Sequence, residues 1–147
     1  MKIVRTNSSN KDFKTLVVKL DKELEIRDGE MHSFYHQYNT IETINEVVVL
    51  YVNDKAVACG ALKKYHDNME LKRMFVLPDY RSKGYATTVL KELEIWAKEL
   101  EFKQIILETG INQPEAISFY IKNGYIQIEN YGQYSGITTS LCFLKIL

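Results

Sequence analysis

Residues 81–86, Arg-Ser-Lys-Gly-Tyr-Ala, are the part of this sequence whose residue types and spacing are best suited to chemistry. They follow an apolar run that ends in Val-Leu-Pro and precede a segment with helically spaced apolar residues. A glycine-bearing loop between a strand and a helix can direct several backbone N–H groups at one point, and the helix N-terminus adds the positive end of its dipole. Because Arg81 and Lys83 add positive charge, the segment predicts a site for a pyrophosphate or another polyphosphate.

This loop does not match the common nucleotide-binding motifs. The P-loop pattern Gly-x-x-x-x-Gly-Lys-[Ser/Thr] is absent, and the loop has one glycine, whereas a dinucleotide fingerprint requires several. Taken alone, one glycine with two basic residues just before it is also typical of a surface turn. The choice between a turn and a ligand site therefore depends on the elements around the loop.

The composition is that of a single globular domain without an excess of either charge. The chain has 147 residues, enough for a sizeable core, with 19 basic and 19 acidic residues. A zero net charge argues against general nucleic-acid binding. Cys59 and Cys142 fit neither a disulfide framework nor a zinc site. The charged N-terminus is unlike a secretion signal and no run approaches a membrane span, so we expect one cytoplasmic domain over 1–147 that binds neither nucleic acid nor membrane.

The N-terminal half predicts a strand, a helix and then three consecutive strands. The first strand covers 2–6, and apolar residues recur at helical spacing up to Asp28-Gly29, with Ser9 or Asn10 as the candidate cap. Residues 31–44 favour a short second helix or an ordered loop. Short turns separate the strands at 47–52, 56–62 and 69–77, so these should be antiparallel neighbours.

The C-terminal half predicts a parallel crossover followed by a helix and two strands. Apolar residues from 84 to 100 form one helical face, and 105–107 is a short continuous apolar strand typical of a buried parallel strand. Together with strand 69–77 they form a right-handed βαβ unit. A helix over 114–123 and strands at 125–129 and 138–147 complete the chain. The fold class is mixed α/β: a mostly antiparallel sheet with one parallel crossover, flanked by about four helices.

The pattern Arg-x-x-Gly-x-Ala after Val-Leu-Pro resembles the acyl-CoA-binding motif of the GNAT superfamily of N-acetyltransferases, and the element order resembles that fold over essentially the whole chain. The resemblance implies that backbone N–H groups of 82–86 cradle the CoA pyrophosphate, with Arg81 closing over it. It also implies that the edge of the strand at 74–76 pairs with the pantetheine arm and polarises the thioester carbonyl. The implied cofactor-binding residues are Met74, Phe75, Val76, Arg81, Ser82, Lys83, Gly84, Tyr85, Ala86, Asn112 and Gln113.

A second resemblance lies in the helix at 114–123. Gln113, Ala116 and Tyr120 match the family pattern Asn-x-x-Ala-x-x-x-Tyr, with glutamine in place of asparagine. The longer Gln113 amide, or that of the adjacent Asn112, would bind the pantetheine. Tyr120 is the implied general acid, because a phenol with a pKa of about 10 can protonate a departing thiolate whose conjugate acid has a pKa of about 8.5. Without the family, packing in the core beside Phe119 would be the favoured explanation of Tyr120.

Glu70 and Glu108 are the candidate general bases. They lie at ends of the two strands that part around the thioester in this family, and an amine must lose a proton before it attacks. Either residue could instead be a solvated carboxylate at a strand end. A cleft with both would favour a small cationic acceptor, such as a polyamine, an amino sugar or an amino acid. A peptide N-terminus or a lysine side chain stays open as the acceptor.

The predicted reaction is acetyl transfer from acetyl-CoA to a primary amine by direct attack in a ternary complex, because no cysteine lies where a covalent intermediate would form. His32 and His36 could share a helical face, but no third ligand is evident, so we expect no metal. Tyr131, Gln133 and Tyr134 could form an aromatic lid over the acceptor. A non-catalytic acyl-CoA sensor and a protein-interaction module are the alternatives, and a homodimer stays open.

Overall fold

The computed structural model describes residues 1–28 and 43–147, and in these residues seven strands form one sheet in the order β1-β2-β3-β4-β5-β7-β6. The strands are β1 (Lys2–Thr6), β2 (Glu46–Val52), β3 (Lys55–Tyr65), β4 (Asn68–Val76), β5 (Gln104–Gly110), β6 (Ile126–Ile128) and β7 (Ser140–Ile146). The helices are α1 (Lys11–Asp28), α3 (Tyr85–Glu99) and α4 (Pro114–Lys122), with 3-10 turns η2 (Pro78–Tyr80) and η3 (Gly132–Tyr134).

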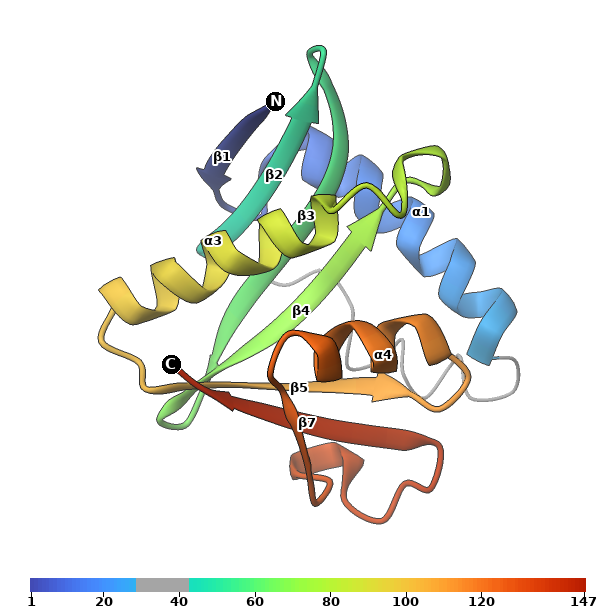
Figure 1. The fold of residues 1–147 in the computed structure, drawn as a ribbon, viewed down its shortest axis with the longest axis vertical. Helices are drawn as coiled ribbons and strands as arrows, with labels where there is room; N and C mark the ends of the chain where they lie inside the picture. Colours follow the sequence, from blue (N-terminus) through green and yellow to red (C-terminus); the bar gives the residue numbers. More distant parts are fainter. Residues whose placement is uncertain (29–42) are drawn as a thin grey trace.

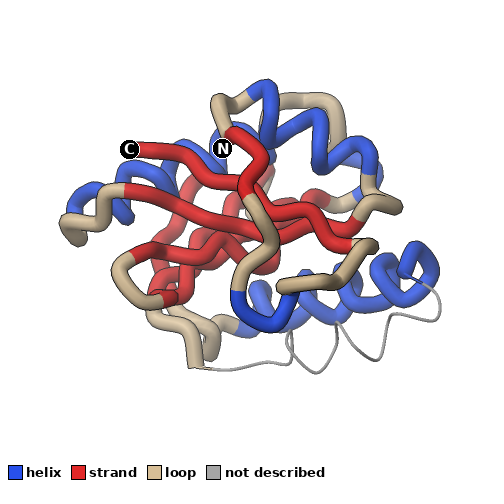
Figure 2. The backbone as a smooth tube through the Cα atoms, turned by 90° about the horizontal axis from the view of Figure 1, so that it is seen from below, coloured by secondary structure: helices blue, strands red, loops and turns tan. Residues whose placement is uncertain are grey.

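The sheet is covered on both faces. Figures 1 and 2 show α1 on one face and α3 with α4 on the other. The central strands β2 and β3 are therefore buried on both sides, which explains their nearly continuous apolar sequences. In α3 the buried residues Val89, Leu90, Leu93 and Ala97 form one stripe toward the sheet. None of the helices in the described ranges is long and apolar enough to cross a membrane.

The predicted fold class is confirmed. The first four strands are antiparallel neighbours, and α3 connects β4 to the parallel strand β5. Asn10 rather than Ser9 caps α1, since its side-chain oxygen accepts a hydrogen bond from the Phe13 N–H at 2.9 Å. The helix or loop expected at 31–44 lies almost entirely outside the described residues, as do His32 and His36.

The sheet opens between β4 and β5, and this opening positions the site. The two strands pair only at Met69 with Ile105 and at Glu70 with Ile106. Farther along, β4 carries one extra residue opposite β3, at Arg73, whose φ is +61°. Such a bulge bends a strand and ends regular pairing. The wedge between the diverging strands leaves backbone groups of β4 available for another chain-like partner.

Gly60 allows β3 to pass close to this bulge. A Cβ at Gly60 would overlap the Met74 sulfur and would lie 2.8 Å from Cδ1 of Leu93 on α3. Any side chain here would therefore push Met74 out of position. Because Met74 lies in the part of β4 that diverges from β5, the glycine in β3 helps to shape the opening.

Candidate active site

Two cavities meet where β4 and β5 diverge. The larger, about 790 Å³, runs from the end of β4 past residues 80–87 to α4, and the smaller, about 120 Å³, lies between α1 and the facing parts of β4 and β5. Both cavities share one wall, made of Leu20, Met74, Gln113, Ala116 and Tyr120. A group held in the larger cavity at this wall would thus face a molecule held in the smaller one.

The loop singled out in the sequence opens into the larger cavity. Gly84 is the N-cap residue of α3, has a φ of +84°, and offers no side chain to cap the helix. The N–H groups of the first turn of α3 therefore have no side-chain cap at Gly84 and can bind an anion. A Cβ at Gly84 would meet no atom within 4 Å, so the cradle is open on that side. The loop and the cavity volume fit the phosphates and arm of a CoA-sized ligand.

Not every residue expected at the cofactor site lines this cavity. Met74, Phe75, Val76 and Gln113 do, together with residues 81, 82 and 84–86. Lys83 and Asn112 are not among the lining residues. The Asn112 amide instead donates a hydrogen bond to the Arg27 carbonyl oxygen at 3.3 Å, and so connects the turn between β5 and α4 to the end of α1.

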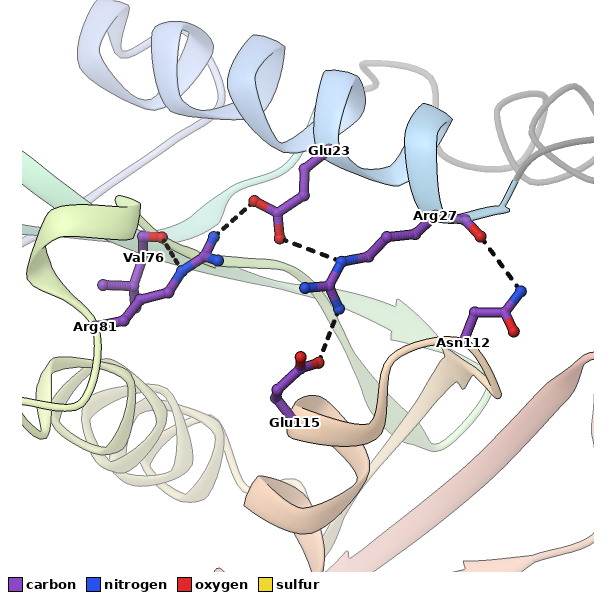
Figure 3. Close-up of polar contacts among 6 residues, drawn as sticks. All are labelled: Glu23, Arg27, Val76, Arg81, Asn112 and Glu115. Atoms are coloured by element: carbon purple, nitrogen blue, oxygen red, sulfur yellow. Dashed lines mark hydrogen bonds and ion pairs between the residues drawn. The ribbon is translucent and has the colours of Figure 1, made fainter.

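A chain of ion pairs, drawn in Figure 3, joins charged residues that line the larger cavity. Arg81 donates from Nε to the Val76 carbonyl oxygen at 2.9 Å and from Nη2 to Glu23 at 2.7 Å. Arg27 lies 3.8 Å from Glu23 and donates to Glu115 at 2.8 Å. These contacts connect the loop after β4 with α1 and with the first turn of α4. The guanidinium expected over the pyrophosphate is therefore paired with a carboxylate of α1.

Tyr120 lies at the junction of the two cavities and is buried. Its ring packs edge-on against Phe119 and Tyr125, with centroid separations of 5.2 and 5.7 Å. Burial, assisted by the charge of Glu108, raises the pKa of Tyr120 above that of an ordinary phenol. The hydroxyl group therefore carries its proton at physiological pH.

The smaller cavity brings Glu70 and Glu108 together, as the strand arrangement predicted. Both line it, and Glu70 is only 5% exposed. Tyr131, from the segment between β6 and β7, donates a hydrogen bond to Oε2 of Glu70 at 2.6 Å. Tyr134 lines the same cavity. Of the tyrosines in this segment, Tyr134 thus lines the smaller cavity and Tyr131 contacts Glu70, which also lines it.

Sequence reasoning missed the positive charges of this cavity. Lys72 and Arg73 line it, with Lys72 Nζ 3.9 Å from Oε1 of Glu70 and Arg73 bound to Asp21 of α1 at 2.9 Å. Burial lowers the pKa of Lys72, while Glu70 partly offsets that effect. The two-residue period of a strand could have placed Lys72 beside Glu70. Nothing in the sequence revealed that the bulge turns Arg73 toward α1.

The chain belongs to the acetyltransferase (GNAT) family, whose family model matches residues 15–125. It is 38% identical over 80 residues to Probable N-acetyltransferase 14 of Xenopus tropicalis, a match that covers 53% of this chain and 39% of that protein. It is 32% identical over 93 residues to the IAA acetyltransferase of Azospirillum brasilense, covering 62% and 61%. The matches thus span less than two thirds of the length of these curated relatives.

Solved structures have the same fold. The proposed acyl-CoA N-acyltransferase from Klebsiella pneumoniae has a TM-score of 0.84 at 25% identity, covering 99% of this chain and 97% of that one. The PaiA N-acetyltransferase from Thermoplasma acidophilum, solved in complex with coenzyme A, has a TM-score of 0.72 at 17% identity, covering 99% and 98%. At that identity the second likeness concerns the fold alone.

Proposed function

We propose that this protein is an acetyl-CoA-dependent N-acetyltransferase that acetylates a primary amine by direct attack in a ternary complex. The observation that carries the proposal is the junction of two cavities at Met74 and Tyr120. One cavity is large enough for a CoA-sized ligand and has at one end a glycine loop and a helix N-terminus, which suit phosphate groups. The other contains two carboxylates. A reaction between a thioester and an amine needs these two compartments to meet.

The larger cavity would hold acetyl-CoA, which supplies the activated acetyl group. Backbone N–H groups of 82–86 would bind its pyrophosphate, and Arg81 would exchange Glu23 for a phosphate oxygen. The free edge of β4 at 74–76 would pair with the amide groups of the pantetheine arm. An N–H group of Met74 or Phe75 would donate to the thioester oxygen and stabilise the negative charge that develops there.

The remaining chemistry consists of two proton transfers. Glu70, with Glu108 as the other candidate, would accept the proton of the acceptor ammonium and so release the nucleophilic amine. Tyr120 would donate its phenolic proton to the departing sulfur. Cys59 and Cys142 are both buried and neither lines the two cavities. This arrangement favours direct attack over a route through an acetylated cysteine.

The acceptor is proposed to be a small cationic amine. Two carboxylates in a cavity of about 120 Å³ favour a positively charged group of limited size. Lys72 would repel a second positive charge near Glu70. We therefore expect small monoamines to be better acceptors than polyamines.

The test is a panel of primary amines assayed for thiol release from acetyl-CoA. We expect steady release with some amines, and none when the protein is incubated with acetyl-CoA alone. Tight binding of acetyl-CoA without release by any amine would instead identify a non-catalytic sensor. Release of one equivalent of thiol without an amine, with acetylated protein in the mass spectrum, would contradict direct attack.

A further inference from the structure

The Glu70 carboxylate has two oxygens in different surroundings. Oε2 accepts the Tyr131 hydroxyl at 2.6 Å, a short distance typical of a hydrogen bond to a charged oxygen. Oε1 lies 3.9 Å from the Lys72 ammonium. Oε2 is therefore occupied by a hydrogen bond from Tyr131, which is 61 residues away in the sequence. Oε1 faces Lys72, which lines the proposed acceptor cavity.

Tyr131 is held in place from several sides. Its ring lies 5.2 Å from the Tyr65 ring and 5.9 Å from the Tyr134 ring, the latter edge-on. Gly132 follows it with a φ of +53°, and a Cβ there would lie 2.6 Å from the Tyr65 hydroxyl. Only glycine fits this approach without displacing its neighbours. The direction of the Tyr131 hydroxyl is thus fixed by packing and does not depend on the hydrogen bond alone.

We propose that Tyr131 is a positioning residue that fixes the orientation of the Glu70 carboxylate, so that its second oxygen can accept the proton of the acceptor amine. The proposal rests on the proposed function, in which Glu70 is a candidate base. The hydrogen bond from Tyr131 occupies Oε2 and stops the carboxylate from rotating. Oε1 is then the oxygen that receives the proton.

Tyr131 can act as a donor over the whole working range of pH. Burial, followed by the charge of Glu70 and the hydrogen bond to it, raises the pKa of Tyr131 above that of an ordinary phenol. The other charged or titratable groups around Glu70 are Lys63, Lys72, Arg73, Glu108, Tyr134 and Cys142. All of them remain when only the Tyr131 hydroxyl is removed, so that substitution isolates its effect.

The experiment compares Tyr131→Phe with Tyr65→Phe. Both remove one hydroxyl from neighbouring rings of the same cluster, but only the first touches Glu70. In Tyr131→Phe the carboxylate loses the hydrogen bond that orients it, and we expect kcat to fall about 10–100-fold, from the usual strength of a hydrogen bond to a charged group, while the KM for acetyl-CoA stays unchanged. Tyr65→Phe should leave both kcat and that KM unchanged.

An NMR measurement that needs no acceptor separates this proposal from the proposed function. The carboxyl carbon of Glu70, assigned in labelled protein with Glu70→Gln, is compared at neutral pH in the wild type and both variants. We expect its chemical shift to change in Tyr131→Phe alone. An unchanged signal, or equal changes in both variants, would overturn the role of Tyr131. If instead the signal changes in Tyr131→Phe and Glu70→Gln retains the wild-type kcat, the assignment of Glu70 as the base is wrong.

Discussion

The larger cavity, or cleft, proposed to hold the cofactor, and the smaller one, the proposed acceptor cavity, meet at one wall but are constructed in different ways. The proposed phosphate end of the cleft is formed by one continuous segment between β4 and the start of α3, in which residues 81, 82 and 84–86 line the cavity. The acceptor cavity depends on side chains from α1, β4, β5, α4 and η3, with Tyr131 behind Glu70. A backbone cradle recognises a group common to many ligands, whereas a side-chain cavity can change its specificity with every substitution.

The comparison predicts that the two regions respond differently to substitution. Changes in the cradle should alter CoA affinity without altering the pH profile. Changes in the acceptor cavity should alter rate, acceptor KM and pH dependence while acetyl-CoA affinity is retained. Tyr120 belongs to the shared wall, and its substitution should affect chemistry most.

Tyr120→Phe should have the largest effect. It removes only a hydroxyl from a packed ring, so we expect CoA affinity and folding to change little, while kcat falls about 10²–10⁴-fold through loss of the general acid. The measurement is kcat with chemistry shown to limit the rate. Tyr125→Phe is the matched control, because it breaks a hydrogen bond of 2.8 Å to buried Glu94 outside both cavities. Tyr125→Phe should lower the stability of the protein and leave kcat unchanged. If kcat of Tyr120→Phe stays within twofold of the wild-type value, Tyr120 is not the general acid.

Gly84→Glu should have the next largest effect, on CoA binding. The substitution forces a side chain into a φ of +84° and adds a negative charge where phosphates are expected. Repulsion of a few kcal/mol at about 4 Å corresponds to about 10²–10³-fold weaker binding by calorimetry. Gly136→Glu is the control, because Gly136 also has a positive φ, +78°, and open space around its Cβ, but lines neither cavity. Equal losses in both variants would show that strain alone is responsible.

The contrast between a site made of one continuous segment and a site made of side chains from distant segments also explains what the sequence could predict. The loop at 81–86, the helix that starts at Pro114 and the antiparallel strands are local patterns, and their elements appear within a few residues of the expected bounds. Glu70 and Glu108 were predicted to line one cleft because Glu70 lies near the start of one strand and Glu108 near the end of the next, and these strands were expected to diverge. The contact of Tyr131 with Glu70 joins residues 61 apart, and the contact of Arg81 with Glu23 joins residues 58 apart. No periodicity or local motif encodes such pairings, since they depend on how the finished elements pack.

The double variant Glu70→Gln with Glu108→Gln tests the acceptor cavity as a whole. It retains shape and removes both carboxylates, so activity should fall about 10²-fold at neutral pH and recover partly at alkaline pH, where more acceptor is free amine. The acceptor KM should rise more than that of acetyl-CoA, because neither residue lines the larger cavity. Full pH–rate profiles of kcat/KM provide the measurement. An unchanged profile would place the base elsewhere in the cavity.

Glu23→Gln should have the smallest effect, and in the opposite direction. Glu23 accepts a hydrogen bond from Arg81 at 2.7 Å, and their side chains are 29% and 38% exposed. A partly exposed ion pair contributes about 0–1 kcal/mol, so releasing Arg81 to a phosphate should tighten CoA binding up to about fivefold, less so at high salt. Glu115→Gln is the control, since it removes a carboxylate from the same network without touching Arg81. Weaker binding in Glu23→Gln would mean that Glu23 orients Arg81 for the ligand instead of competing with it, and the cleft would then share the side-chain dependence of the acceptor cavity.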